Sequence, residues 1–262
     1  MLCSLVLLLA TKRKGRVVFW DQVVPISDKP TEESGESKDK FAVDRLFARL
    51  VTKIGQALQC RRMVWRHRGA VPTYGSVPAE TLQGWLTLYW DLADMQAYAP
   101  YHNKPKNTTS SSNGVKLSLQ QAFVAALVQG KHETFRLRLA TGDDVKVIDR
   151  LVMGLAQFEG EPESYILSKQ QLQQDGFLGR SLYYCILVDD IAKEYTCAMA
   201  LCYVACDLSG GRFLYLEDLF VEEPYRGKGC GKLVMSTLAL VAQSLQCTKA
   251  VWQALDWNAP AL

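Results

Sequence analysis

The sequence lacks several features that mark common functional classes. Its formal net charge is only +3, and no basic patch is interleaved with aromatic residues, so no nucleic-acid partner is expected. Its cysteines form no CxxC pair, and Cys202 and Cys206 have no histidine nearby, so no metal site is expected. The apolar start, residues 1–10, is shorter than the about 20 residues that cross a membrane. Its basic residues follow the apolar run, unlike those of a secretory signal, so we expect a short buried strand or an incorrect gene start, and no membrane partner.

What the chain does contain is enough apolar sequence for a packed core. Hydrophobic residues make up 48% and charged residues 22% of 262 positions, which is typical of a large globular domain with or without an extension. Cys185, Cys197, Cys202 and Cys206 lie in apolar runs, where free cysteine behaves as a small hydrophobe. We therefore expect free thiols and a reducing, cytoplasmic compartment.

The composition divides the chain into three parts. Residues 1–40 read as a tail and a polar linker, residues 41–130 as a helical extension of unknown function, and residues 131–262 as the main domain. Helices are predicted at 43–58, 78–98 and 119–128, with a second linker at 101–116. The basic cluster at 61–68, around Trp65, is either an anion or RNA contact or a solvated helix end.

The main domain begins with an alternating strand at 135–139. Thr141 and Asp144 then resemble a helix cap, and an apolar face from Val147 to Leu155 predicts the helix that follows. A second helix, strands at 183–188 and 196–206, and a hairpin signal lead to a third strand at 213–221. The expected order is strand, two helices, three strands, helix and strand, which is typical of the α/β (α+β) fold class.

The third strand ends in a glycine loop, and a helix follows the loop directly. Between Arg226 and Lys232 three glycines alternate with other residues, and the helical period begins after them. Glycine lets the backbone approach a bulky anion, and a helix N-terminus offers N–H groups without intrahelical partners. The stretch therefore predicts either a phosphate site or a glycine-rich turn without a ligand.

Two common nucleotide loops do not fit this stretch. The triphosphate loop needs a hydroxyl residue after Gly-Lys, and Leu233 stands there instead. The dinucleotide loop needs a GxGxxG frame, whereas Gly227, Gly229 and Gly231 alternate and Lys232 follows.

The stretch instead resembles the acetyl-CoA loop of the GCN5-related N-acetyltransferases (GNAT). The pattern of Arg or Gln, two residues, Gly, one residue, and Gly or Ala is met by Arg226, Gly229 and Gly231. Together with 215–221 (YLEDLFV) and 255–258 (LDWN), it is similar to the diamine branch, the spermidine/spermine and thialysine acetyltransferases. The resemblance implies a GNAT domain, acetyl-CoA as co-substrate, a small-molecule amine as acceptor, and a homodimer as a further expectation.

The resemblance also assigns roles to residues. Glu217 is the expected catalytic residue, which holds the amine and takes its proton, and its neighbour Asp218 is expected to point to the opposite face. Acceptor contacts are implied for Phe158, Glu159, Asp218 and Trp252. Coenzyme contacts are implied on a bulged strand and in the loop after it: Leu219, Phe220, Val221, Arg226, Gly227, Lys228, Gly229, Cys230, Gly231, Lys232 and Asn258. Cys230 is expected to be a small loop residue rather than a nucleophile.

One departure from the family bears on activity. In the resembled branch a tyrosine after the Trp-Asn motif protonates the leaving thiolate, and the last strands close the sheet, whereas this sequence reaches Leu262 soon after Asn258. An incomplete C-terminus predicts an exposed sheet edge and slow transfer. Two functions remain open: an acetyl-CoA-dependent amine N-acetyltransferase, or a non-catalytic acetyl-CoA-binding or scaffold protein.

Overall fold

The computed structural model describes part of the chain, in two compact units. The described residues are 7–12, 15–20, 50, 52–54, 56–57, 62–65, 84–91, 94–95, 118–129, 132–165, 167–179, 181–207 and 211–259. The first unit comprises Met1–Gln83 and the second Gly84–Leu262. Both linkers expected from the sequence lie outside the described residues.

The first unit contains a three-stranded sheet. Strand β1 (Leu7–Lys12) is antiparallel to β2 (Gly15–Trp20), which is parallel to β3 (Arg62–Trp65). The predicted strand at the apolar start is therefore present from Leu7 onward. Within the helix predicted at 43–58, the described positions are helical, and the rest lie outside the described residues. In the basic cluster, the described segment is the strand β3 and not a helix end.

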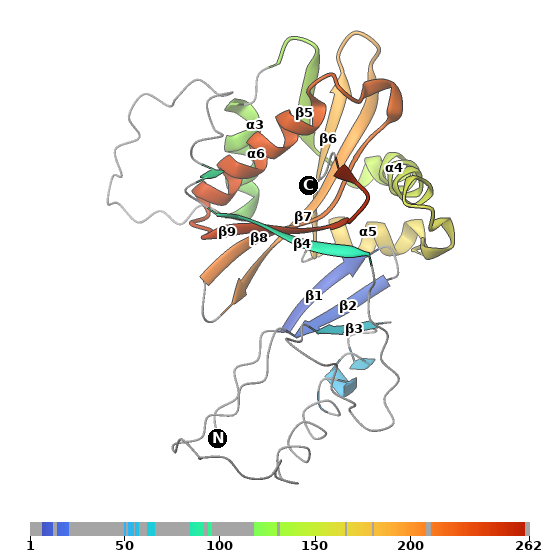
Figure 1. The fold of residues 1–262 in the computed structure, drawn as a ribbon, viewed down its shortest axis with the longest axis vertical. Coiled ribbons are helices and arrows are strands. Elements are labelled where there is room, and N and C mark those ends of the chain that lie inside the picture. Colours follow the sequence, from blue (N-terminus) through green and yellow to red (C-terminus); the bar gives the residue numbers. More distant parts are fainter. Residues whose placement is uncertain are drawn as a thin grey trace. The chain divides into compact units, whose positions relative to one another are not determined.

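The second unit is built on a six-stranded mixed sheet with the strand order β4-β9-β8-β7-β6-β5 (Figure 1). All neighbours are antiparallel except β8 and β9, which are parallel. The strands are β4 (Trp85–Asp91), β5 (Phe135–Leu139), β6 (Tyr184–Asp190), β7 (Tyr195–Asp207), β8 (Gly211–Val221) and β9 (Lys249–Leu255). From β5 onward, the predicted order of strands and helices is confirmed.

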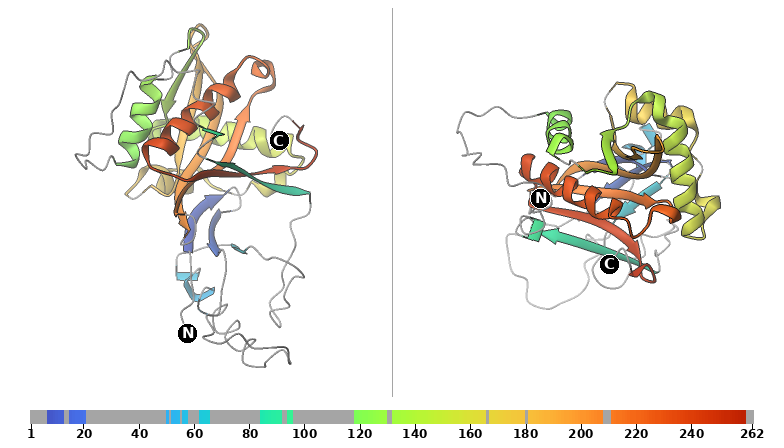
Figure 2. Two further views of the ribbon diagram at one scale, coloured as in Figure 1. Left: turned by 60° about the vertical axis from the view of Figure 1, so that its left-hand side comes forward. Right: turned by 90° about the horizontal axis from the view of Figure 1, so that it is seen from above.

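Helices cover both faces of this sheet (Figure 2). Helices α3 (Leu119–Gln129) and α6 (Cys230–Ser244) pack on one face, and α4 (Val145–Phe158) and α5 (Lys169–Phe177) pack on the other. Short 3-10 turns lie at η2 (Gly142–Asp144), η3 (Pro162–Ser164) and η4 (Glu223–Tyr225). Each face thus buries its own apolar cluster, one against α6 and one against α4. In the described part of the chain, no helix is both long enough and apolar enough to cross a membrane.

Strand β4 corrects an expectation from the sequence. The segment 78–98 was predicted as a helix, but residues 85–91 form a strand that pairs antiparallel with the full length of β9. Its aromatic and β-branched residues suit a strand as well as a helix, and pairing with β9 decides between them. In the described sheet the edge strand on this side is therefore β4 and not β9. The second compact unit, Gly84–Leu262, contains β4 and α3 as well as the segment 131–262.

The turn η2, which leads into α4, is held by the predicted cap at Thr141 and by an ion-pair network. The main-chain N–H of Thr141 donates to Asp144 Oδ2 at 2.8 Å. Arg138 on β5 donates from both Nη atoms to the Asp144 carboxylate, at 2.8 and 2.9 Å, and from Nε to Asp189 on β6 at 2.8 Å. Burial alone would raise the pKa of Asp144, but the hydrogen bonds from Arg138 and Thr141 lower it overall.

Candidate active site

Strand β8 carries one extra residue where it runs beside β7. Leu201 pairs with Asp218 and Cys202 pairs with Leu216, so Glu217 is the inserted residue of the predicted β-bulge. Leu216 and Leu219 both pack in the cluster that contains α6, so the two residues between them lie on the α4 face. The expectation that Glu217 and Asp218 point to opposite faces is wrong, because the bulge interrupts the alternation of side chains.

The bulge places two carboxylates beside a pair of stacked tyrosines. Asp218 is buried and Glu217 is half-buried. Tyr203 on β7 lies opposite Tyr215 on β8, with ring centroids 5.0 Å apart and ring planes at 14°. Burial raises the pKa of Tyr203 well above its ordinary value, and the nearby Glu217 carboxylate raises it further. A half-buried carboxylate in this position can hold a cation and accept a proton.

Strands β8 and β9 separate just beyond this bulge. Their pairing covers only Phe213–Leu216 and Lys249–Trp252, although β8 continues to Val221 and β9 to Leu255. After Leu216, the main chain of β8 on the side of β9 is therefore not paired with β9. An extended ligand could pair there as a strand would.

The glycine loop after β8 opens onto free space. Gly227 and Gly229 have φ values of +72° and +92°, a conformation that favours glycine, and Gly229 is the N-cap of α6. A Cβ built on Gly227, Gly229 or Gly231 would meet no described atom within 4 Å. No side chain caps this helix N-terminus. The first-turn N–H groups and the positive end of the helix dipole therefore face an open space of the kind that binds anions.

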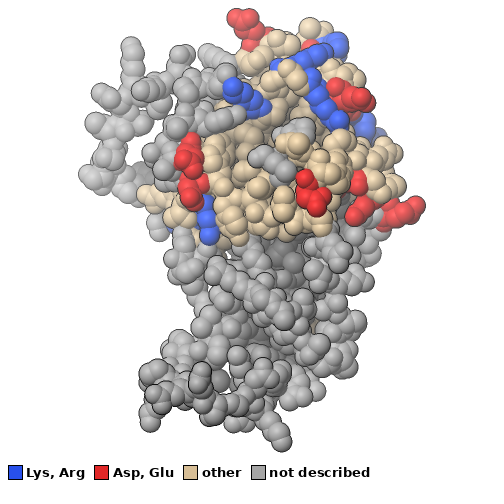
Figure 3. Space-filling model, in the orientation of Figure 1, with Lys and Arg blue, Asp and Glu red and all other residues tan. Residues whose placement is uncertain are grey.

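Basic side chains surround this loop. Lys193 Nζ lies 3.4 Å from Tyr225 Oη, and Lys228 Nζ lies 5.3 Å from the centre of the same ring. Figure 3 shows Lys and Arg side chains gathered on the upper part of the second unit, where Figure 1 draws the loop before α6. The local charge therefore favours an anionic ligand at the loop, although the net charge of the whole chain is small.

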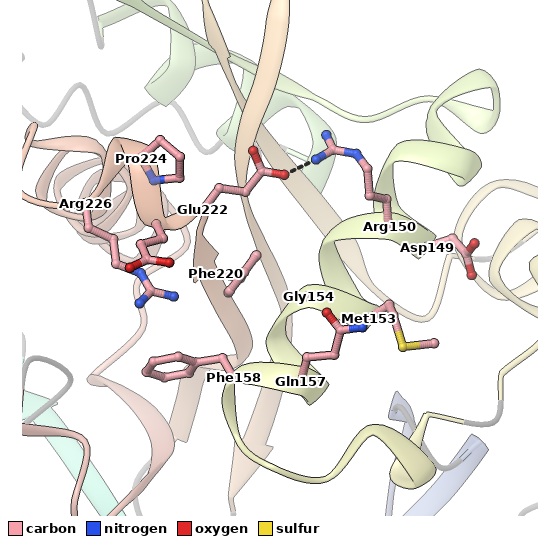
Figure 4. A pocket seen from close by; sticks show the side chains of 11 residues that line it. Asp149, Arg150, Met153, Gly154, Gln157, Phe158, Phe220, Glu222, Pro224 and Arg226 are labelled. Atoms are coloured by element: carbon pink, nitrogen blue, oxygen red, sulfur yellow. Dashed lines mark hydrogen bonds and ion pairs between the residues drawn. The ribbon is translucent and has the colours of Figure 1, made fainter.

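A pocket of about 830 Å³ lies between α4 and the end of β8 (Figure 4). In the pocket lining, Phe220 packs closely against Gly154. A Cβ added to Gly154 would lie 2.8 Å from the Phe220 ring. Arg226 extends into the pocket, with its guanidinium carbon 4.4 Å from the centre of the Phe158 ring and its Nε donating to Val221 O at 3.0 Å. The lining residues are Asp149, Arg150, Met153, Gly154, Gln157, Phe158, Phe220, Glu222, Glu223, Pro224 and Arg226.

Arg150 ties the pocket wall on α4 to the ends of two strands. Its guanidinium forms an ion pair with Glu222, which follows β8, and donates to Tyr195 Oη and Thr196 O of β7, each at 2.7 Å. The ring of Tyr195 also lies below the guanidinium, 4.8 Å from its carbon. These contacts fix the distance between α4 and the strand that leads into the glycine loop.

The pocket gathers some of the residues singled out in the sequence and not others. Phe158, Phe220 and Arg226 line it together, and Phe158 also contacts Trp257 after β9, with centroids 5.5 Å apart. Phe158 is the last residue of α4, and Glu159 follows in a turn. Cys230 is not a loop residue as expected, because it is the first residue of α6 and is buried. The others lie outside the pocket lining: Glu159, Glu217, Asp218, Leu219, Val221, Gly227, Lys228, Gly229, Cys230, Gly231, Lys232, Trp252 and Asn258.

Sequence reasoning missed the polar wall that α4 contributes to this pocket. Asp149, Arg150, Met153 and Gln157 recur at spacings of three and four residues, which places them on one helix face. This periodicity is visible in the sequence, but a polar helix face usually points to solvent, so it does not by itself indicate a pocket. Tyr203 was missed as well, because only the register of β7 against β8 places it beside Glu217.

Comparisons with known proteins identify the family. Residues 152–262 match the model of the acetyltransferase (GNAT) family. Over 132 residues the chain is 30% identical to a thialysine N-epsilon-acetyltransferase of Bos taurus, a match that covers 48% of this chain and 78% of that protein. Over 135 residues it is 32% identical to the human spermidine/spermine N(1)-acetyltransferase-like protein 1, covering 50% of this chain but only 19% of that protein.

Among solved structures, an aminoglycoside acetyltransferase from an uncultured soil metagenomic sample matches with a TM-score of 0.41 and 16% identity, covering 49% of this chain and 82% of that chain. From the family model and the thialysine acetyltransferase match, this chain belongs to the acetyltransferase (GNAT) family.

Proposed function

We propose that the chain is an acetyl-CoA-dependent N-acetyltransferase that acts on a primary amine of a small polyamine or lysine-like acceptor. The observation that carries this proposal is the open glycine loop at the N-terminus of α6, directly after a bulged strand that bears Glu217. The relatives named for thialysine and spermidine/spermine support the class of acceptor.

The loop fits the diphosphate of acetyl-CoA. Side chains at Gly227, Gly229 and Gly231 would project into the open space where the main chain must approach phosphate oxygens. The main-chain N–H groups of residues 227–232 would hold the diphosphate, and Arg226, Lys228 and Lys232 would add positive charge. Asn258, which follows the end of β9, would contact the coenzyme from the other side of the opening.

The separated strands fit the pantetheine arm. Main-chain groups of Leu219 and Val221 would pair with its amides, and an N–H of the bulged strand would polarise the thioester carbonyl. Phe220 would support this arm from the pocket side, where its ring contacts α4. Acetyl-CoA supplies an activated acyl group when it is bound.

Glu217 would prepare the acceptor amine. An alkyl ammonium has a pKa near 10.4, so roughly one molecule in a thousand or fewer is neutral at pH 7. Glu217 would hold the ammonium and take its proton, directly or through water, and Asp218 on the same face would add negative charge. Phe158, Glu159 and Trp252 would contact the rest of the acceptor. Direct transfer needs no covalent enzyme intermediate, which agrees with the buried position of Cys230.

Calorimetric titration with acetyl-CoA tests the binding half of this proposal. We expect saturable binding by the wild-type chain and none by Gly229→Glu, because that side chain would fill the cradle. Gly179→Glu is a matched control, because Gly179 has a similar φ of +78° and equally open surroundings but lies after α5. Binding by Gly229→Glu equal to that of the wild type would refute the assignment of the loop.

A further inference from the structure

We infer that Tyr203 is a positioning residue that donates a hydrogen bond from its Oη to the Glu217 carboxylate and holds this carboxylate toward the acceptor. The inference rests on the proposed function of Glu217 as the group that takes the proton of the amine. It adds a residue from a different strand, β7, to the proposed site.

The strand register makes Tyr203 and Glu217 diagonal neighbours. Tyr203 lies directly opposite Tyr215, and Leu201, two residues earlier on the same face of β7, lies opposite Asp218. The bulge inserts Glu217 between these two pairs, on the same face of the sheet. Diagonal neighbours on one face are within reach of an aromatic side chain, and Tyr carries its hydroxyl at the far end of the ring.

The ring of Tyr203 is held in place, and its hydroxyl is buried. Tyr203 is only 5% exposed, and its stacking on Tyr215 fixes the plane of the ring. Its Oη makes no hydrogen bond of ordinary geometry with the residues that the structure describes. A buried donor without an acceptor is unfavourable, so a small change in side-chain angle that reaches the Glu217 carboxylate would be favoured.

The surroundings make Tyr203 a donor rather than an acid or base. Burial first, and then the Glu217 carboxylate, raise the pKa of Tyr203 well above its ordinary value, so the phenol keeps its proton at any working pH. Among the described residues, the titratable groups that surround this contact are Asp218 and Tyr215 on β8 and, next to Asp218, Cys185 on β6. Asp218 opposes ionisation of Glu217, whereas the Tyr203 hydroxyl favours it.

Titration of the Glu217 carboxyl tests the inference without any need for activity. The pKa of this group is measured by NMR with ¹³C-labelled glutamate and assigned with Glu217→Gln. In Tyr203→Phe, which keeps the ring and removes only the hydroxyl, we expect the midpoint to rise by about one pH unit, because a hydrogen bond to a charged group favours the charged form. Tyr183→Phe is the control, because that buried hydroxyl donates to Leu172 O, away from Glu217. An unchanged midpoint in Tyr203→Phe overturns the inference.

A kinetic profile separates this inference from the proposed function. If both hold, the acidic limb of kcat/KM moves to higher pH in Tyr203→Phe and stays in place in Tyr183→Phe. A shifted NMR midpoint in a chain without turnover would support the Tyr203–Glu217 contact and refute the proposed enzymatic function. Turnover without a shifted midpoint would support the proposed function and refute the contact. In the wild type, the contact also predicts a slowly exchanging Tyr203 hydroxyl proton that is lost in Glu217→Ala, which has no side-chain acceptor, so the test does not depend on the folding of one variant.

Discussion

Replacing Gly231 by glutamate should separate stability from coenzyme binding. Gly231 is the second residue of α6 and has no positive φ, so glutamate fits its backbone without strain. The new Cβ would meet no described atom within 4 Å. Because glutamate is preferred over glycine in helices and an acidic side chain is favourable in the first turn, the free energy of unfolding should stay constant or rise by up to ~1 kcal/mol. For a unit of this size, that corresponds to an increase of about 2–4 °C in Tm at most.

Coenzyme binding should respond in the opposite direction. In a helix the Cα–Cβ bond tilts toward the N-terminus, so the glutamate side chain projects into the space where the diphosphate would contact the first-turn N–H groups, and its charge repels the phosphates. Losing one charge-assisted hydrogen bond costs about 1.5–3 kcal/mol, which weakens binding by about 10- to 100-fold. Calorimetric titration with acetyl-CoA measures this loss, and thermal unfolding measures stability on the same sample.

A truncated co-substrate provides the control for this prediction. S-acetylpantetheine lacks the diphosphate, so its use as an acyl donor should be equal in the wild type and in Gly231→Glu. Undiminished affinity of Gly231→Glu for acetyl-CoA would refute the reasoning, and so would an equal loss with S-acetylpantetheine.

Three further predictions follow from named contacts. Gly154→Ala should destabilise the chain by about 1–3 kcal/mol in urea unfolding, because its Cβ would lie 2.8 Å from the Phe220 ring; unaltered stability would contradict this packing. In Arg138→Gln the free energy of unfolding should fall by about 1–2 kcal/mol at pH 7, a value reduced to allow for the 31% exposure of Arg138 to solvent. Because the pKa of Asp144 is lowered, the stability that this carboxylate contributes is present above about pH 4 and is lost below it. The loss of stability in Arg138→Gln, relative to the wild type, should therefore become smaller in acid. A constant loss from about pH 7 to about pH 2.5 would argue against this pairing. Glu217→Gln should reduce kcat and leave acetyl-CoA affinity unchanged, and parallel loss of both would remove Glu217 from the chemistry.

The sequence was most informative where local patterns agree with the fold. The alternation in β5, the Thr141 cap and the glycine loop before α6 are each encoded within a few neighbouring residues, and the structure confirms the elements that they predict. A bulge in β8 was predicted by resemblance and is confirmed, whereas its position at Glu217 was not predicted.

Features set by distant pairing could not be predicted from the sequence in the same way. The segment 85–91 carries apolar residues compatible with a helix, and only its partner strand β9, which lies far along the chain, selects a strand. The orientation of Asp218 depends on a one-residue shift against β7, which reverses every later side chain in β8. The pocket wall on α4 likewise depends on which strand ends the helix meets.

An acetyl-transfer assay on the purified chain tests the central claim most directly. Acetyl-CoA is supplied with spermidine or thialysine, thiol release is followed over time, and the acetylated amine is identified by mass. The account predicts saturable, acceptor-dependent thiol release that depends on Glu217. A folded chain that neither binds acetyl-CoA nor releases thiol with either amine would contradict it.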